Sequence, residues 1–102
     1  MENWSPIQVL DAINSGKRLR LIDVREPYEF TEGHIPEAEL IPLGQLPEAL
    51  ARLPKEETII VVCRSGARSL RAAQFLSGHG YQHVVNMHGG MLSWKGKVKH
   101  GR

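Results

Sequence analysis

The feature that most constrains this fold is an uninterrupted apolar run, TIIVV at Thr58–Val62, near the middle of the chain. A strand with one face in water alternates apolar and polar residues, whereas a continuous β-branched run is typical of a strand covered on both faces. Such strands belong mostly to parallel sheets flanked by helices. The run therefore predicts an α/β fold with a mostly parallel central sheet and helices on both faces.

The rest of the sequence alternates helical and strand patterns, as this fold class requires. Ser5, Pro6 and Gln8 combine a capping side chain, a proline at the first helical position and a capping-box partner, which predicts a helix from there to about Asn14. Further strands are predicted at 18–24, near 40–41 and at 83–87. Further helices are predicted at 27–32, at 43–53 and from 69 to 78 or 80, with one or two last helical turns within 89–97.

Length and composition predict one domain over residues 1–102. The chain is 41% hydrophobic and 24% charged, the balance of an ordinary domain that buries a core without cross-links. The net charge of +2 is small and scattered, which argues against a nucleic-acid partner. No apolar run approaches a membrane span and no signal peptide is evident, so we expect no membrane partner and a cytoplasmic protein. The basic C-terminal segment KGKVKHGR is expected to be solvated and partly frayed.

The chain has one cysteine, Cys63, at the end of the TIIVV strand. A single cysteine forms no intrachain disulfide, and Cys-x-x-Cys redox or zinc motifs are excluded. The loop RSGAR follows, and then a helical pattern. Gly66 permits unusual backbone conformations, the helix N-terminus supplies free amides, and Arg64 and Arg68 add positive charge. These surroundings favour an anion, including a cysteine thiolate.

Cys63 is either a buried structural residue or a reactive one. A lone cysteine is most often a small buried hydrophobic residue. Here Arg64 and Arg68 flank the Ser-Gly-Ala loop and cannot be buried unpaired without a large cost. We therefore predict a reactive nucleophile at Cys63.

The position of an arginine separates two kinds of cysteine chemistry. Cysteine phosphatases use Cys-x5-Arg, in which the arginine binds the phosphoryl group through two hydrogen bonds. Here the corresponding position is Ser69, and Arg68 comes one residue earlier. A loop one residue shorter forms a tighter bowl, which suits one sulfur atom on the cysteine better than a tetrahedral phosphoryl group.

The segment CRSGARS resembles the active-site loop of the rhodanese family of sulfurtransferases. Upstream, LIDVREPYEFTEGHIPEAELIPL is similar to a family signature, and downstream VVNMHGGMLSW is similar to the closing Gly-Gly and tryptophan segment. The three motifs occur in order over essentially the whole chain. The resemblance implies a rhodanese-like fold in a single-domain member.

The resemblance also implies a double-displacement reaction. The Cys63 thiolate takes sulfane sulfur from thiosulfate or a related persulfide donor, and the persulfide then gives it to cyanide or a cellular thiol, with a sulfur-relay protein as a further partner. No metal or organic cofactor is needed. Loop amides stabilise the persulfide and two arginines hold an incoming dianion. The expected substrate-binding residues are Arg64, Ser65, Gly66, Ala67, Arg68 and Ser69.

Asp23, Arg25 and His34 are expected to support the structure around the site. Asp23 and Arg25 end a strand on the same sheet edge as Cys63, where they shape the site or steady its loop as an ion pair. His34 is expected to bond to the backbone. Two other functions stay open: a cysteine phosphatase or arsenate reductase of related fold, and a non-catalytic rhodanese-like carrier or interaction module.

Overall fold

The fold is built on one five-stranded parallel sheet. The structure is a computed structural model that describes residues 1–101. Its strand order is β1-β5-β4-β2-β3, and all four neighbouring pairs are parallel. The strands are β1 (Glu2–Trp4), β2 (Leu19–Asp23), β3 (Glu39–Leu40), β4 (Thr58–Val62) and β5 (Val84–Met87). The predicted parallel α/β fold is confirmed.

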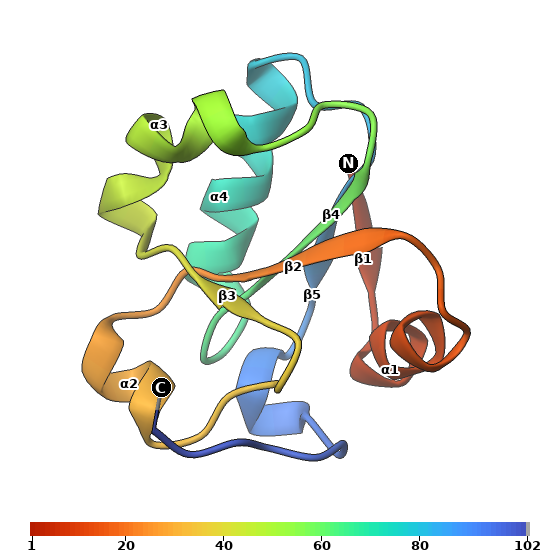
Figure 1. Cartoon of the computed structure of the whole chain (residues 1–102), viewed down its shortest axis with the longest axis vertical. Helices are drawn as coiled ribbons and strands as arrows, with labels where there is room; N and C mark the ends of the chain where they lie inside the picture. Colours follow the sequence, from red (N-terminus) through yellow and green to blue (C-terminus); the bar gives the residue numbers. More distant parts are fainter. Residues whose placement is uncertain (102) are drawn as a thin grey trace.

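Helices cover both faces of this sheet (Figure 1). One face carries α3 (Leu46–Ala49) and α4 (Ala67–Gly78), and the other carries α1 (Pro6–Asn14) and the 3-10 turn η3 (Gly90–Ser93). The short α2 (Pro27–Thr31) follows β2 at the sheet's edge. The capping box predicted for α1 is present, with Gln8 N donating to Ser5 Oγ at 3.2 Å and Ser5 N donating to Gln8 Oε1 at 2.7 Å.

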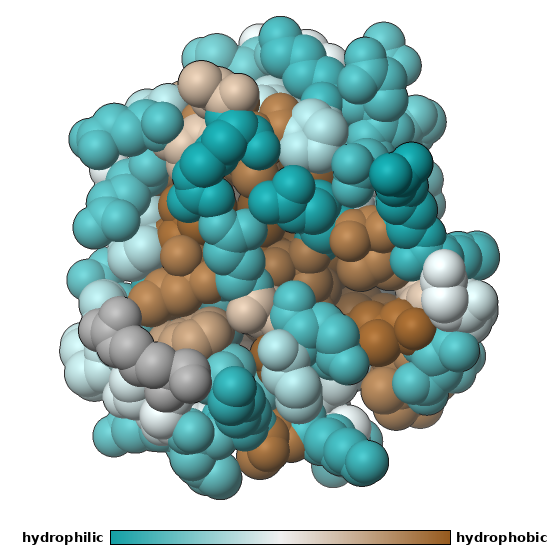
Figure 2. All heavy atoms as spheres, in the orientation of Figure 1, coloured by the Kyte–Doolittle hydropathy of each residue, from teal (hydrophilic) through white to brown (hydrophobic). Residues whose placement is uncertain are grey.

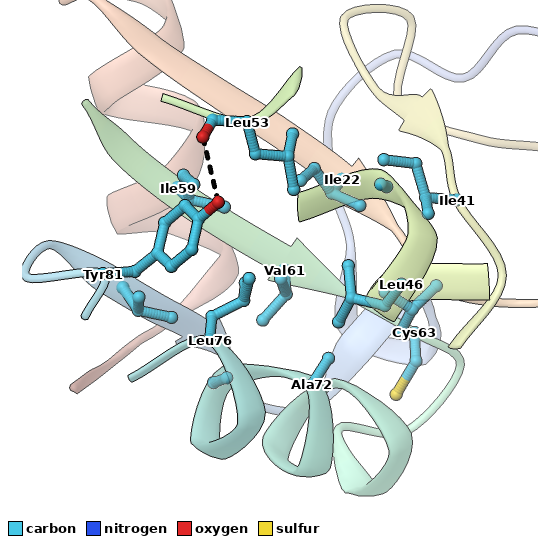
Figure 3. Packing of buried hydrophobic residues seen from close by; sticks show 14 residues of the cluster. Ile22, Ile41, Leu46, Leu53, Ile59, Val61, Cys63, Ala72, Leu76 and Tyr81 are labelled. Carbon is cyan, nitrogen blue, oxygen red and sulfur yellow. Dashed lines mark hydrogen bonds between the residues drawn. The ribbon is translucent and has the colours of Figure 1, made fainter. Parts of the chain in front are cut away.

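The TIIVV strand divides its side chains between the two halves of the core, as predicted. Ile59 and Val61 pack towards α3 and α4, whereas Ile60 and Val62 pack towards α1. All four are fully buried. Figure 3 shows the first half of this core, with Tyr81 at one end and Cys63 at the other.

Tyr81 ties the loop before β4 to this core. Its hydroxyl lies 2.8 Å from the carbonyl oxygen of Leu50 and 2.9 Å from that of Leu53. Replacing Tyr81 with phenylalanine removes a buried donor, so we expect the free energy of unfolding in urea to fall by ~0.5–1.5 kcal/mol. Tyr28→Phe is the matched control, because Tyr28 is 68% exposed and its change is expected to lie within ~0.5 kcal/mol. Equal effects of the two changes would contradict the role given to Tyr81.

Three local predictions were wrong. The helix predicted at 43–53 is split into η1 (Leu43–Gln45), α3 and η2 (Leu50–Arg52), and it contains Pro47, which lacks an amide proton. Helix α4 begins two residues before the predicted start, since the φ of +105° at Gly66 turns the chain directly into it. Strand β1 was not predicted, because three residues with two exposed side chains carry no apolar pattern.

The C-terminal segment is also better ordered than predicted. Lys99 and His34 form an antiparallel bridge, with backbone N–H···O distances of 2.8 and 3.0 Å. Gly101 N donates to the carbonyl oxygen of Thr31 at 2.8 Å. Residues 99–101 are thus held against the end of α2, and Arg102 lies outside the described residues. Over 1–101, no helix is long and apolar enough to span a membrane.

Candidate active site

Cys63 directly follows β4, at the edge where the parallel strands reach their carboxyl ends. The neighbouring strands place Asp23 at the end of β2 and Met87 at the end of β5 on the same edge. In parallel α/β sheets this edge is the usual place for a binding site. The predicted position of Cys63, between a buried strand and a helix N-terminus, therefore matches the structure.

The Cys63 sulfur faces the first turn of α4. Gly66 N donates a hydrogen bond to Sγ at 3.0 Å, and Sγ lies 3.3 Å from the Ser69 hydroxyl oxygen. The thiol donates in this contact, and after ionisation the Ser69 hydroxyl can donate to the thiolate instead. The N-terminus of the 12-residue helix α4 adds its positive dipole end.

Burial alone raises the pKa of the Cys63 thiol, but hydrogen bonds outweigh it. They come from the Ser69 hydroxyl and from the backbone amides of Ser69, Gly66 and Ser65, and the net pKa lies below its ordinary value. An ionised sulfur with donors around it is a nucleophile.

Ser69→Ala is expected to raise the pKa of Cys63, since alanine cannot donate to the thiolate. Losing a hydrogen bond to a charged group costs ~1.5 kcal/mol, so alkylation by iodoacetamide should slow by about tenfold at pH values below the thiol pKa. The pH profile of alkylation then moves to higher pH. Ser77→Ala on the same helix is the matched control, because the Ser77 hydroxyl has no hydrogen-bond partner among the described residues. Overlapping pH profiles for wild type and Ser69→Ala would contradict this account.

The Gly-Gly segment after β5 supports the cysteine loop from the other side. Met91 N donates to the carbonyl oxygen of Cys63 at 2.8 Å, and Leu92 N donates to that of Arg64 at 3.0 Å. Gly90 has a φ of +59°, and a Cβ added there would lie only 2.4 Å from the Arg64 carbonyl oxygen. Glycine is therefore required for this segment to approach the loop so closely.

A polar chain extends from the site through the sheet. While the thiol is protonated, the Ser69 hydroxyl donates its one proton to Asn86 Oδ1 at 2.5 Å, and Asn86 Nδ2 donates to Asn3 Oδ1 at 3.0 Å. Asn86 is 97% buried in β5, and sequence reasoning assigned it no role. A polar residue inside the apolar segment VVNM was the signal available, because buried amides require partners.

Two of the three arginines around the loop are paired with carboxylates. Arg25 and Asp23 are buried and joined by contacts of 2.8–3.1 Å, and Arg25 also donates to the carbonyl oxygen of Gly33 at 2.9 Å. These contacts form the ion-pair arrangement considered for Asp23 and Arg25. Arg68 donates to both carboxylate oxygens of Glu29, at 2.7 and 2.8 Å.

Glu29 was missed at the sequence level, although it lies within the quoted segment REPYEF. It also accepts from Glu26 N at 3.0 Å, as part of the capping box of α2. The hydrogen bond from Arg68 lowers the pKa of Glu29 to about 2 despite partial burial. Arg64 is the remaining arginine; it is exposed and forms no ion pair within residues 1–101.

A hollow of about 360 Å³, here called the mouth, lies beside Arg64 of the cysteine loop; Cys63 itself is 1% exposed and does not line it. The hollow is lined by Arg25, Tyr28, Glu29, Glu32, Arg64, Met91 and Leu92. Tyr28 and Leu92 are exposed by 68% and 63% and supply apolar surface to this hollow. Figure 2 shows how apolar and polar side chains share one face of the molecule.

His34 contacts the end of α2. The ring of His34 bonds to the Phe30 carbonyl oxygen at 2.8 Å and stacks on the Phe30 ring, as expected for a structural residue. In the described part of the chain, no three His, Cys, Asp or Glu side chains are grouped so that they could hold a metal ion.

Comparisons with known proteins match this chain to the rhodanese-like domain and to relatives named for sulfur chemistry. The sequence model of the rhodanese-like domain matches residues 5–97. A protein of Allochromatium vinosum named sulfurtransferase is 38% identical over 81 residues, covering 79% of this chain and 73% of that one. A relative in Bacillus subtilis with sulfur carrier protein in its name is 36% identical over 87 residues, which cover 85% of this chain and 47% of that one.

One solved structure has the same fold over the full length of this chain. The crystal structure of a rhodanese-like domain protein from Staphylococcus aureus superimposes with a TM-score of 0.90 and 30% identity, covering 100% of both chains. Sulfur transfer in general is the chemistry that these relatives support. With a family match over most of its length, the chain belongs to the rhodanese-like domain family.

Proposed function

We propose that this protein moves sulfane sulfur from thiosulfate or a related persulfide donor to a thiophilic acceptor, through a persulfide on Cys63. The observation that carries the proposal is the setting of Sγ, which faces Gly66 N at 3.0 Å and the Ser69 hydroxyl at 3.3 Å in front of α4. This setting lowers the pKa of the thiol. A thiolate at the end of a buried strand, one residue before Arg64 in the lining of the hollow, can attack a small electrophilic sulfur that reaches it from there.

The reaction proceeds by two displacements. The Cys63 thiolate attacks the outer sulfur of the donor, the donor's S–S bond breaks, and its electron pair leaves with sulfite or with an organic thiolate. The acceptor then attacks the outer sulfur of the Cys63 persulfide, and Sγ departs as a thiolate. Cyanide becomes thiocyanate and a thiol becomes a persulfide, so no net oxidation of the protein occurs.

Each neighbouring group has a role in this scheme. The amides of Ser65, Gly66 and Ser69 and the Ser69 hydroxyl stabilise negative charge on Sγ and on the terminal persulfide sulfur. Arg64 is exposed at the mouth and can contact an anionic donor. Asp23 and Arg25 hold the loop after β2 in place through a buried ion pair. A sulfur-relay protein as acceptor or donor is consistent with the relative whose name includes sulfur carrier.

The phosphatase alternative has less support. It requires an arginine free to bind the phosphoryl group, whereas Arg68 is held by Glu29 through two hydrogen bonds and the following position is Ser69. The non-catalytic alternative accounts poorly for a thiol whose pKa is lowered. Both alternatives can be decided by experiment.

Incubation with thiosulfate followed by intact mass measurement tests the proposal. We expect one added sulfur atom per chain, which is lost again when cyanide is added and thiocyanate appears. An aryl phosphate should release no phosphate in parallel. Absence of the sulfur adduct, or hydrolysis of the aryl phosphate without sulfur transfer, would contradict the proposed function.

A further inference from the structure

The Glu29–Arg68 pair changes which sulfur donor the site can accept. Arg68 was expected to hold an incoming dianion, but its guanidinium donates to both oxygens of Glu29 at 2.7 and 2.8 Å. The Glu29 side chain is only 12% exposed and its carboxylate also accepts from Glu26 N at 3.0 Å. Both partners are therefore held, and the pair is a bidentate, charge-assisted contact of the strong kind.

The charges around the mouth balance each other. Arg25 is neutralised by Asp23 in a buried pair and Arg68 by Glu29, while the exposed Arg64 shares the hollow with Glu32. A dianion at the mouth thus meets Arg64 as the one arginine of these three without an ion-pair partner in the described residues. A dianionic donor that also uses Arg68 has to lie beside the Glu29 carboxylate or compete with it, and both are electrostatically unfavourable.

An organic persulfide does not need Arg68 and is repelled less by the Glu29 carboxylate than a dianion is. It carries at most one negative charge at the sulfur that Cys63 attacks, and its carbon group can lie in the hollow against Tyr28, Met91 and Leu92. The hollow of about 360 Å³ is also much larger than one thiosulfate ion needs. The apolar part of the lining, formed by Tyr28, Met91 and Leu92, and the pairing of Arg68 with Glu29 favour the same class of donor.

We propose that Glu29 is a specificity-determining residue that occupies Arg68 and thereby disfavours dianionic sulfur donors relative to organic persulfides. The inference rests on the proposed function, because it concerns the donor that forms the Cys63 persulfide. The Glu29 pKa of about 2 keeps its carboxylate ionised throughout the neutral range, so the pair persists under assay conditions.

The test compares two donors: thiosulfate and 2-hydroxyethyl persulfide, whose carbon group is uncharged. In Glu29→Gln, the ratio of kcat/KM for thiosulfate to kcat/KM for the alkyl persulfide should rise about tenfold, as expected when a charge-assisted contact becomes available to the dianion. The gain should come mainly from a lower KM for thiosulfate and should shrink as salt is added.

Glu32→Gln is the matched control, since it removes the same charge from the same hollow without touching Arg68. Its donor ratio should change by less than about twofold, as expected for a screened, exposed charge. The double variant Glu29→Gln/Arg68→Gln should lose the gain. An unchanged ratio in Glu29→Gln, or an equal rise in Glu32→Gln, would overturn the role of Glu29 while leaving the proposed function intact. If neither donor adds sulfur to the wild-type protein, the proposed function and the inference both fail.

Discussion

Replacing Cys63 with serine is expected to reduce sulfur transfer by at least about 1,000-fold, the largest effect of any single change in this chain. Cys63 is the only cysteine, so no other thiol can take over. A serine hydroxyl has nearly the same volume but is not ionised at neutral pH and cannot carry a persulfide. The measurements are the rate of thiocyanate formation and the intact mass after incubation with the donor.

The substitution should leave the fold unchanged, which separates loss of chemistry from loss of structure. Serine can still donate to the Ser69 oxygen and accept from Gly66 N, so the melting temperature should stay close to that of the wild type. A sulfur adduct that persists in Cys63→Ser would show that another group carries the sulfur and would remove Cys63 from the mechanism.

Gly90→Ala is expected to destabilise the protein by ~2–5 kcal/mol and to disturb the cysteine loop. The φ of +59° costs a residue with a Cβ ~1–2 kcal/mol. The new Cβ would also lie 2.4 Å from the Arg64 carbonyl oxygen and 2.6 Å from that of Cys63. Backbone atoms cannot move aside cheaply, so overpacking adds ~1–3 kcal/mol. Denaturation in urea measures the first effect, and the rate of Cys63 alkylation measures the second.

Gly16→Ala separates backbone strain from the clash. Gly16 has a similar φ of +72°, but nothing lies within 4 Å of a Cβ added there. Its cost should be ~1–2 kcal/mol, with no change in the reactivity of Cys63. If Gly90→Ala is no more destabilising than Gly16→Ala and alkylates at the wild-type rate, the Gly-Gly segment does not constrain the loop as the structure indicates.

Much of the fold could be predicted because its strongest elements have local patterns. A continuous apolar strand at Thr58–Val62 requires cover on both faces, and the structure supplies it from α1 and α4. The capping box of α1 needs only residues three apart, so its start was also predictable. By contrast, β1 is held by pairing with β5, more than 80 residues away, and three mostly exposed residues give no sign of that pairing.

In the candidate site, too, some features have local sequence patterns and others depend on contacts between distant residues. The sequence by itself determined the fold class, the place of Cys63 at the end of a buried strand and the glycine loop leading into a helix, because neighbouring residues and short spacings specify them. Only the tertiary structure decided that Glu29 occupies Arg68, 39 residues away, and that Asn86 meets Ser69, 17 residues away. These contacts depend on how separate strands and helices converge at the carboxyl edge of the sheet. Charge pairing there, which no local pattern records, determines how much positive charge is left for a donor.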